Sequence, residues 1–162
     1  MTSTSIDDVI KIYPKGPWTT KSKGQLTVLF SLDFHRLKKF ISSTENNRVD
    51  GVTDISGLRM YSVDKLAKGS QGANEWHKVR TELVFATKGS VSWNVVDRSG
   101  DEKRYVLQAN GFGLWVPPCI LHTYESLEND SQILVVANTI YIPEDETTHD
   151  TYDAKSFVST KD

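Results

Sequence analysis

The chain has 162 residues and a formal net charge of −2, with 25% charged and 38% hydrophobic residues. These values are typical of one soluble globular domain, and they exclude a broadly basic surface for nucleic acid. No run approaches the roughly 20 apolar residues that cross a bilayer. Residues 1–15 lack the apolar run of a signal peptide, and Cys119 is the only cysteine, so we expect a cytoplasmic protein without an internal disulfide.

From residue 24 to about residue 142, short β-branched or aromatic runs alternate with Gly, Asn, Asp and Pro, as in an all-β sandwich or barrel. The predicted strands are residues 26–31, 58–63, 82–87, 90–97, 103–108, 113–116, 121–125 and 132–139. About eight strands are enough for a jelly roll. Compact turn sequences at 88–89 and 98–101 favour antiparallel hairpins between neighbouring strands.

Two stretches outside these strands have their own patterns. Residues 33–42 carry Phe34, Leu37 and Ile41 at helical spacing, which predicts a short helix. Residues 43–56 are polar and turn-rich, which predicts a surface loop. We therefore expect a single domain over 1–162, with a barrel core at about 24–142, terminal extensions and one or two short helices.

The first chemically informative stretch runs from Glu75 to Gly89. Glu75 and His77 are separated by one residue, Glu82 follows after four residues, and Gly89 follows after six more. Side chains at i and i+2 of a strand share a face, so Glu75 and His77 are expected to point the same way. Glu82 can join them, or it can be a structural carboxylate bonded to Arg59 or Arg80.

The second stretch runs from Gly111 through Pro117 to His122. By the same strand alternation, His122 shares a face with Tyr124, and Arg59 shares a face with Tyr61. If all these faces point inward, the barrel mouth holds two carboxylates, two imidazoles, two phenols and a guanidinium. Such a set predicts a reactive pocket rather than a packed core.

The two stretches resemble the paired motifs of the cupins, which are small double-stranded β-barrels of the jelly-roll type. Glu75 stands at the position of the first motif's first His, Cys119 at a usual Gly and Ser126 at a usual Asn. Further segments resemble the sugar 3,4-ketoisomerases of the WxcM-like, FdtA-like group, which act on thymidine-diphosphate-linked 4-keto-6-deoxy-sugars. These segments are 24–28, 59–61, 76–78, 88–91, 116–118 with His122, and 135–138.

The resemblance implies an isomerase that removes a proton from C3 of a 4-keto sugar, forms an enediol and returns a proton to C4. His77 is then the expected base or proton shuttle, with His122, Tyr61 and Glu75 as the other catalytic residues. The residues expected to bind substrate are Arg59 (through phosphate), Glu82, Tyr124 and Trp93. No cofactor is expected on this interpretation. Cupin analogy also implies a homodimer.

Departures from the family pattern keep two alternatives open. Glu75 replaces a His, Gly72 and Ala73 replace an Arg-Gly pair, and Glu82 stands where the family tends to have Gln. The first alternative is a metal-dependent cupin enzyme that holds one divalent ion (Zn, Mn, Fe or Ni) through Glu75, His77, Glu82 and His122. The second is a sugar-binding cupin without catalytic activity.

Overall fold

The computed structural model of the protein describes residues 4–42 and 55–157, which form mostly antiparallel β-sheet. The strands are β1 (Ile10–Ile12), β2 (Lys15–Thr19), β3 (Gln25–Val28), β4 (Ser56–Leu66), β5 (Gln71–Trp76), β6 (Glu82–Lys88), β7 (Ser90–Val96), β8 (Glu102–Gln108), β9 (Gly113–Val116), β10 (Leu121–Ser126), β11 (Ser131–Thr139) and β12 (Tyr152–Asp153). The described helices are α1 (Phe34–Ser42) and the 3-10 turns η1 (Ile6–Asp8), η3 (Glu146–Thr148) and η4 (Ala154–Ser156).

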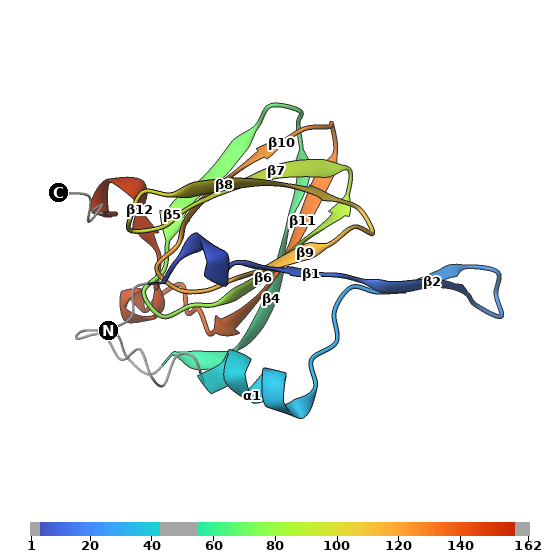
Figure 1. The fold of residues 1–162 in the computed structure, drawn as a ribbon, viewed down its shortest axis with the longest axis horizontal. Coiled ribbons are helices and arrows are strands. Elements are labelled where there is room, and N and C mark those ends of the chain that lie inside the picture. Colours follow the sequence, from blue (N-terminus) through green and yellow to red (C-terminus); the bar gives the residue numbers. More distant parts are fainter. Residues whose placement is uncertain (1–3, 43–54, 158–162) are drawn as a thin grey trace.

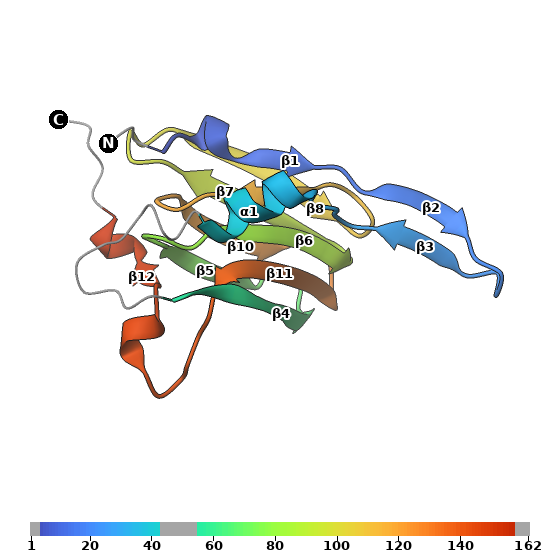
Figure 2. The same ribbon diagram turned by 90° about the horizontal axis from the view of Figure 1, so that it is seen from below.

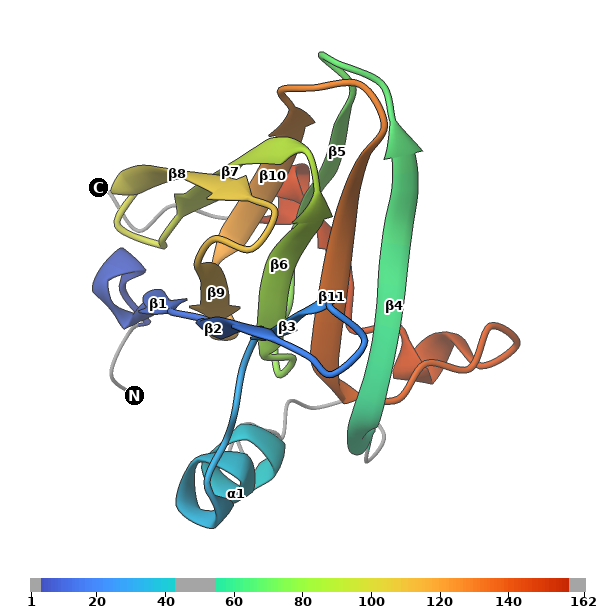
Figure 3. The same ribbon diagram turned by 90° about the vertical axis from the view of Figure 1, so that its right-hand side faces the viewer.

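Two five-stranded sheets form the walls of a barrel. One has the strand order β1-β9-β6-β11-β4 and the other β12-β5-β10-β7-β8. Both bring strands that are distant in the sequence side by side, such as β5 beside β10 and β6 beside β11. Figure 3 shows the two walls facing each other. This is the all-β jelly roll that the strand pattern predicts.

Apolar side chains fill much of the space between the walls. Strand alternation turns Val91 and Val95 of β7 and Leu107 of β8 inward, where all three are fully buried. A second cluster lies around Phe85 and the fully buried Phe40 of α1. Burying one such side chain stabilises a fold by roughly 1.5–3 kcal/mol. These clusters give the polar site a stable frame.

The N-terminal segment begins in the barrel wall and continues outside it. Strand β1 pairs with β9, with Ile10 opposite Trp115, and β2 and β3 then form a separate hairpin. Figures 1 and 2 show this hairpin projecting away from the barrel. Trp18 and Leu26 of the hairpin are 49% and 52% exposed.

The C-terminal elements lie beside β5, as Figures 1 and 2 show. Strand β12 pairs with β5, which places Tyr152 opposite Trp76 and Asp153 opposite Glu75. The indole of Trp76 also packs against the rings of Tyr152 and Phe157. The strand that carries Glu75 is therefore covered along its outer side by β12 and the residues beside it.

The structure confirms each predicted strand to within three residues at either end, and it confirms the helix at 33–42 as α1. The prediction missed β1, β2 and β12, which are short, and gave no bounds for β5. The strand expected to carry both Glu75 and His77 ends at Trp76, so His77 lies just beyond it. Most of the predicted loop at 43–56 lies outside the described residues, and Ser56 already begins β4. None of the described helices is long and apolar enough to cross a membrane.

Candidate active site

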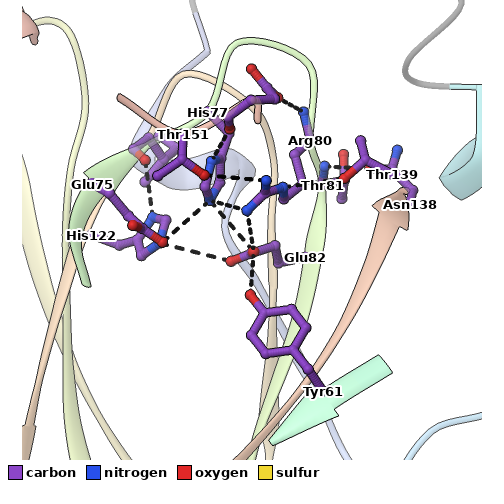
Figure 4. Close-up of polar contacts among 12 residues, drawn as sticks. Tyr61, Glu75, His77, Arg80, Thr81, Glu82, His122, Asn138, Thr139 and Thr151 are labelled. Atoms are coloured by element: carbon purple, nitrogen blue, oxygen red, sulfur yellow. Dashed lines mark hydrogen bonds and ion pairs between the residues drawn. The ribbon is translucent and has the colours of Figure 1, made fainter. Parts of the chain in front are cut away.

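The two motif stretches meet between the sheets. The imidazole centroids of His77 and His122 are 5.2 Å apart. Glu82 contacts both rings, with Oε1 3.4 Å from Nε2 of His77 and Oε2 3.8 Å from Nε2 of His122. Oε1 of Glu75 lies 3.9 Å from the same His77 nitrogen. Figure 4 shows these side chains directed toward one another, with Tyr61 reaching Glu82 from β4.

A bulge in β5 aims Glu75 into this cluster. In the pairing of β5 with β10, Glu75 lies opposite His122 and Ala73 lies opposite Thr123, so Asn74 is an extra residue. Ala73 and Asn74 have φ values of 60° and 63°. Non-glycine residues adopt this conformation at an energetic cost, and bulges are frequent beside active sites, where they redirect a side chain. Without the bulge, Asn74 would face His122.

His77 is held in one tautomer. Its Nδ1 lies 2.5 Å from the main-chain carbonyl oxygen of Asp150, which accepts but cannot donate, so Nδ1 carries the proton. Nε2 therefore faces the cluster. Arg80 is 2% exposed and places Nη1 3.3 Å from this Nε2 and 3.5 Å from Oε1 of Glu82. The guanidinium also donates to the hydroxyl groups of Thr139 and Thr151.

Glu82 is a buried, ionised carboxylate at the centre of the cluster. Burial alone would raise its pKa, but the neighbouring imidazoles of His77 and His122 and the charge of Arg80 outweigh burial and hold the pKa well below its usual range. Tyr61 donates its phenolic proton to Oε1 at 3.0 Å. Burial and the adjacent Glu82 charge raise the pKa of Tyr61 well above 10, so this phenol stays protonated.

His122 is neutral at pH 7. Burial lowers its pKa to about 4, although the charge of Glu82 opposes this shift. Its Nδ1 lies 3.2 Å from the carbonyl oxygen of Ile120, so Nδ1 carries the proton and Nε2 has a lone pair. The indole of Trp93 stacks on the imidazole with centroids 5.3 Å apart. The arrangement gives an oriented, unprotonated nitrogen.

A cavity of about 180 Å³ lies beside the cluster. Its walls are formed by Tyr61, Val63, Ala73, Glu75, Glu82, Trp93, His122, Tyr124, Ile133 and Val135. Ionisable groups therefore face apolar side chains across a space equal to about six water molecules, at roughly 30 Å³ each. This volume suits a single sugar ring. His77 is not on the wall and reaches the cavity through Glu75 and Glu82.

Tyr124 and Trp93 both line this cavity, but in different ways. Burial and the charge of Glu75 raise the pKa of Tyr124, so its phenol is a proton donor at neutral pH. Trp93 is 3% exposed and stacks on the rings of both His122 and Tyr124. Its position supports these two rings.

Arg59 lies outside the cavity wall. Its guanidinium packs over the rings of Tyr61 and Tyr141, 5.2 and 5.1 Å from their centroids. Burial lowers its pKa, as does the charge of Arg80. Its buried Nε has no hydrogen-bond partner within the described part of the chain.

The cluster also has the outline of a metal site. Glu75, His77 and His122 each offer one ligand atom, and these atoms lie within 4.8 Å of one another. The ligand atom of His77 would be Nε2, since its Nδ1 is bonded to Asp150. Nη1 of Arg80 already lies 3.3 Å from that Nε2. A divalent ion would meet a fixed positive charge there, so these residues fit a Zn, Mn, Fe or Ni ion poorly.

Sequence reasoning placed too little weight on Arg80 and missed Asp150. The sequence predicts Arg80 only as one of two candidate partners of Glu82, and the 3.5 Å ion pair confirms this partner. Its position between His77 and Glu82 is a signal that could have marked it as a site residue. Asp150 follows the barrel in an acidic, irregular segment, and no pattern there distinguishes it from its neighbours.

The family described as FdtA (WxcM-like, C-terminal) matches residues 33–160. No curated protein matches the sequence. Among solved structures, the sugar 3,4-ketoisomerase QdtA from Thermoanaerobacterium thermosaccharolyticum, in complex with TDP, is 21% identical with a TM-score of 0.65. That match covers 95% of this chain and 94% of QdtA.

Two further solved structures match at lower identity. A 3,4-ketoisomerase from Helicobacter canadensis is 14% identical with a TM-score of 0.66, over 93% of this chain and 95% of that chain. The dTDP-4-dehydrorhamnose 3,5-epimerase from Bacillus anthracis is 16% identical with a TM-score of 0.63, over 93% of this chain and 80% of that chain. At these identities the likeness establishes a shared fold, the predicted cupin-type barrel.

Proposed function

Because the chain belongs to the WxcM-like, C-terminal (FdtA) family, we propose that it is an isomerase that moves the ketone of a nucleotide-linked 4-keto-6-deoxy-sugar from C4 to C3. The observation that carries this proposal is the cavity of about 180 Å³, whose walls carry an imidazole, two phenols and two carboxylates. Ketoisomerisation needs a base beside the ketone and a donor for its oxygen. The cavity offers both.

His122 is the base in this proposal. It lies on the cavity wall, its pKa of about 4 keeps it neutral at pH 7, and Nε2 carries its lone pair. Glu82, 3.8 Å away, stabilises the imidazolium that forms when Nε2 accepts the C3 proton. The proton on Nε2 exchanges with water, and the same nitrogen then gives a proton to C4.

Tyr124 moves the second proton. Its phenol protonates the C4 oxygen as the C3 proton leaves, which gives the enediol. The C3 hydroxyl then returns a proton to Tyr124 while C4 takes the proton held by His122, and the ketone is left at C3. Both proton transfers balance within these two residues.

The remaining polar residues orient the substrate. Glu75 accepts a hydrogen bond from the C3 hydroxyl, and His77, 3.9 Å behind it, contacts both carboxylates and keeps them in place. Tyr61 keeps Glu82 in place through its 3.0 Å hydrogen bond. Arg59 binds the diphosphate, since a guanidinium suits bidentate recognition of phosphate.

Proton NMR in deuterated water tests the function. The protein is incubated with thymidine-diphosphate-linked 4-keto-6-deoxyglucose, and we expect solvent deuterium in the sugar and a 3-keto product. His122→Gln should lower the rate about 10²–10⁴-fold. His35→Gln, at an exposed position on α1, is the matched control. Binding without any exchange by the wild-type protein would support the non-catalytic alternative instead.

We also propose a cytoplasmic homodimer that acts in polysaccharide biosynthesis, where nucleotide-linked sugars are consumed. Support for the dimer comes from the N-terminal arm, defined here as β1 to β3. Four large apolar side chains are exposed along it: Ile10, Tyr13, Trp18 and Leu26. A second copy of the chain would remove this apolar surface from water.

A further inference from the structure

Asp150 binds four consecutive residues of the active-site loop although it lies in the C-terminal segment. Its Oδ1 accepts the main-chain N–H of Lys78 at 2.9 Å, and Oδ2 accepts those of Val79 at 2.9 Å and Arg80 at 2.7 Å. Its main-chain carbonyl accepts the Nδ1 proton of His77 at 2.5 Å. Asp150 is 1% exposed.

These hydrogen bonds provide acceptors for buried main-chain N–H groups of the loop. The chain leaves β5 at Trp76 and enters β6 at Glu82, and the residues between lie outside both strands and are mostly buried. Buried N–H groups that lie outside a ladder need another acceptor. The carboxylate of Asp150 supplies it to three successive amides, which form a small anion-binding nest.

The next residue extends the contact to the guanidinium. Oγ1 of Thr151 accepts from Nη2 of Arg80 at 3.2 Å. Asp150 and Thr151 together therefore bind the loop backbone, the His77 ring and the Arg80 side chain. The His77 ring and the Arg80 side chain both contact Glu82.

We propose that residues 150 and 151 are positioning residues that set the tautomer of His77 and the orientation of Arg80. The acid–base network is then complete with the C-terminal segment docked beside the barrel. The effect on turnover rests on the proposed function, whereas the effect on the tautomer does not.

Docking of the segment does not depend on Asp150 alone. Nε1 of Trp76 donates to Oγ of Ser156 at 3.0 Å, and the guanidinium of Arg98 lies over the rings of Trp76 and Phe157. Together with the pairing of β12 and β5, these contacts keep the segment in place when Asp150 is changed. Substitution at position 150 thus reports on positioning.

The test compares Asp150→Asn with Glu144→Gln, the same chemical change at an exposed acid of the same segment. Asp150→Asn keeps the main-chain carbonyl, but an amide N–H₂ replaces one of the oxygens that face the loop N–H groups. The loop is then pushed away, and the His77 ring moves from that carbonyl. Nitrogen-15 NMR of the ring, assigned with His77→Gln, should show the Nδ1–H tautomer in the wild type and a mixture in Asp150→Asn. Turnover of Asp150→Asn should fall about 10²-fold with little change in KM. The acid limb of its plot of turnover against pH should shift relative to that of the wild type. Glu144→Gln should match the wild type.

A second pair of variants covers the case in which Asp150→Asn does not fold. Thr151→Val removes the acceptor for Arg80 and keeps the shape, and Thr151→Ser keeps the hydroxyl. We expect turnover to fall about 10-fold in the first variant and to be retained in the second. An unchanged His77 tautomer in Asp150→Asn, or equal turnover in the two Thr151 variants, overturns the proposal. If the wild type isomerises no keto-sugar, the proposed function fails and the tautomer still decides the role of Asp150.

Discussion

The buried, neutral His122 should make the stability of the protein depend on pH in a defined window. Burial lowers its pKa to about 4 in the native protein, against 6.5 for an unperturbed imidazole. Between pH 6.5 and about pH 4, His122 binds a proton in the unfolded chain but not in the native protein. Stability is therefore fully present above pH 6.5 and falls as the pH drops toward 4. At 1.36 kcal/mol for each pKa unit, the difference between 6.5 and about 4 corresponds to ~3 kcal/mol.

Urea unfolding at about pH 7.5 and about pH 5 measures this effect. About 2 kcal/mol of the loss falls between pH 6.5 and 5. Protonation of Glu82 lowers the stability only below pH 4.5, the pKa of its carboxyl group in the unfolded chain, which is outside this range. His122→Gln removes the titrating group, so its unfolding free energy should change less between the two pH values, whatever its overall stability. His35→Gln should retain the wild-type dependence. Equal pH dependence in His122→Gln and the wild type would refute the reasoning.

Three further outcomes are expected. Arg59→Gln should weaken binding of thymidine diphosphate about 10–100-fold by calorimetry, as loss of a charged hydrogen bond predicts, and unchanged affinity would remove Arg59 from the phosphate site. Dialysis against a chelator should leave turnover unchanged because Arg80 occupies the place of a cation beside His77, and activity that is lost and then restored by one added metal would favour the metal-dependent alternative. Trp18→Ser should shift the light-scattering mass toward the monomer at low concentration, and a wild-type protein that is monomeric throughout would contradict the dimer.

The fold and the meeting of the two motifs could be predicted because both depend on local patterns. Alternation along β7, β8 and β11 marks inward positions directly. The spacing of Glu75, His77 and Glu82 and the later His122 follow a known arrangement of strands. Once the jelly roll is assumed, these residues have to approach one another.

The finer geometry could not be predicted because it depends on contacts between distant segments. The bulge at Ala73 and Asn74 is needed to bring Glu75 opposite His122. Alanine gives no signal of positive φ, and asparagine gives a much weaker one than glycine. The position of His77 behind the cavity wall follows from the loop that wraps around Asp150. That contact joins residues far apart in the chain and leaves no periodic trace.

In the proposed mechanism, Glu75 at the position of a family His leaves the acid–base work to His122. An ionised carboxylate accepts hydrogen bonds but cannot donate them, whereas an imidazole can do both. With Glu75 at the cavity and His77 behind it, His122 is the imidazole on the wall. His77→Gln should therefore keep measurable proton exchange at C3, about 10–100-fold slowed, while His122→Gln loses about 10²–10⁴-fold. The rates of deuterium incorporation in the two variants decide whether His122 or His77 is the base. A larger loss in His77→Gln than in His122→Gln would place the base on the loop, on the other side of Glu82.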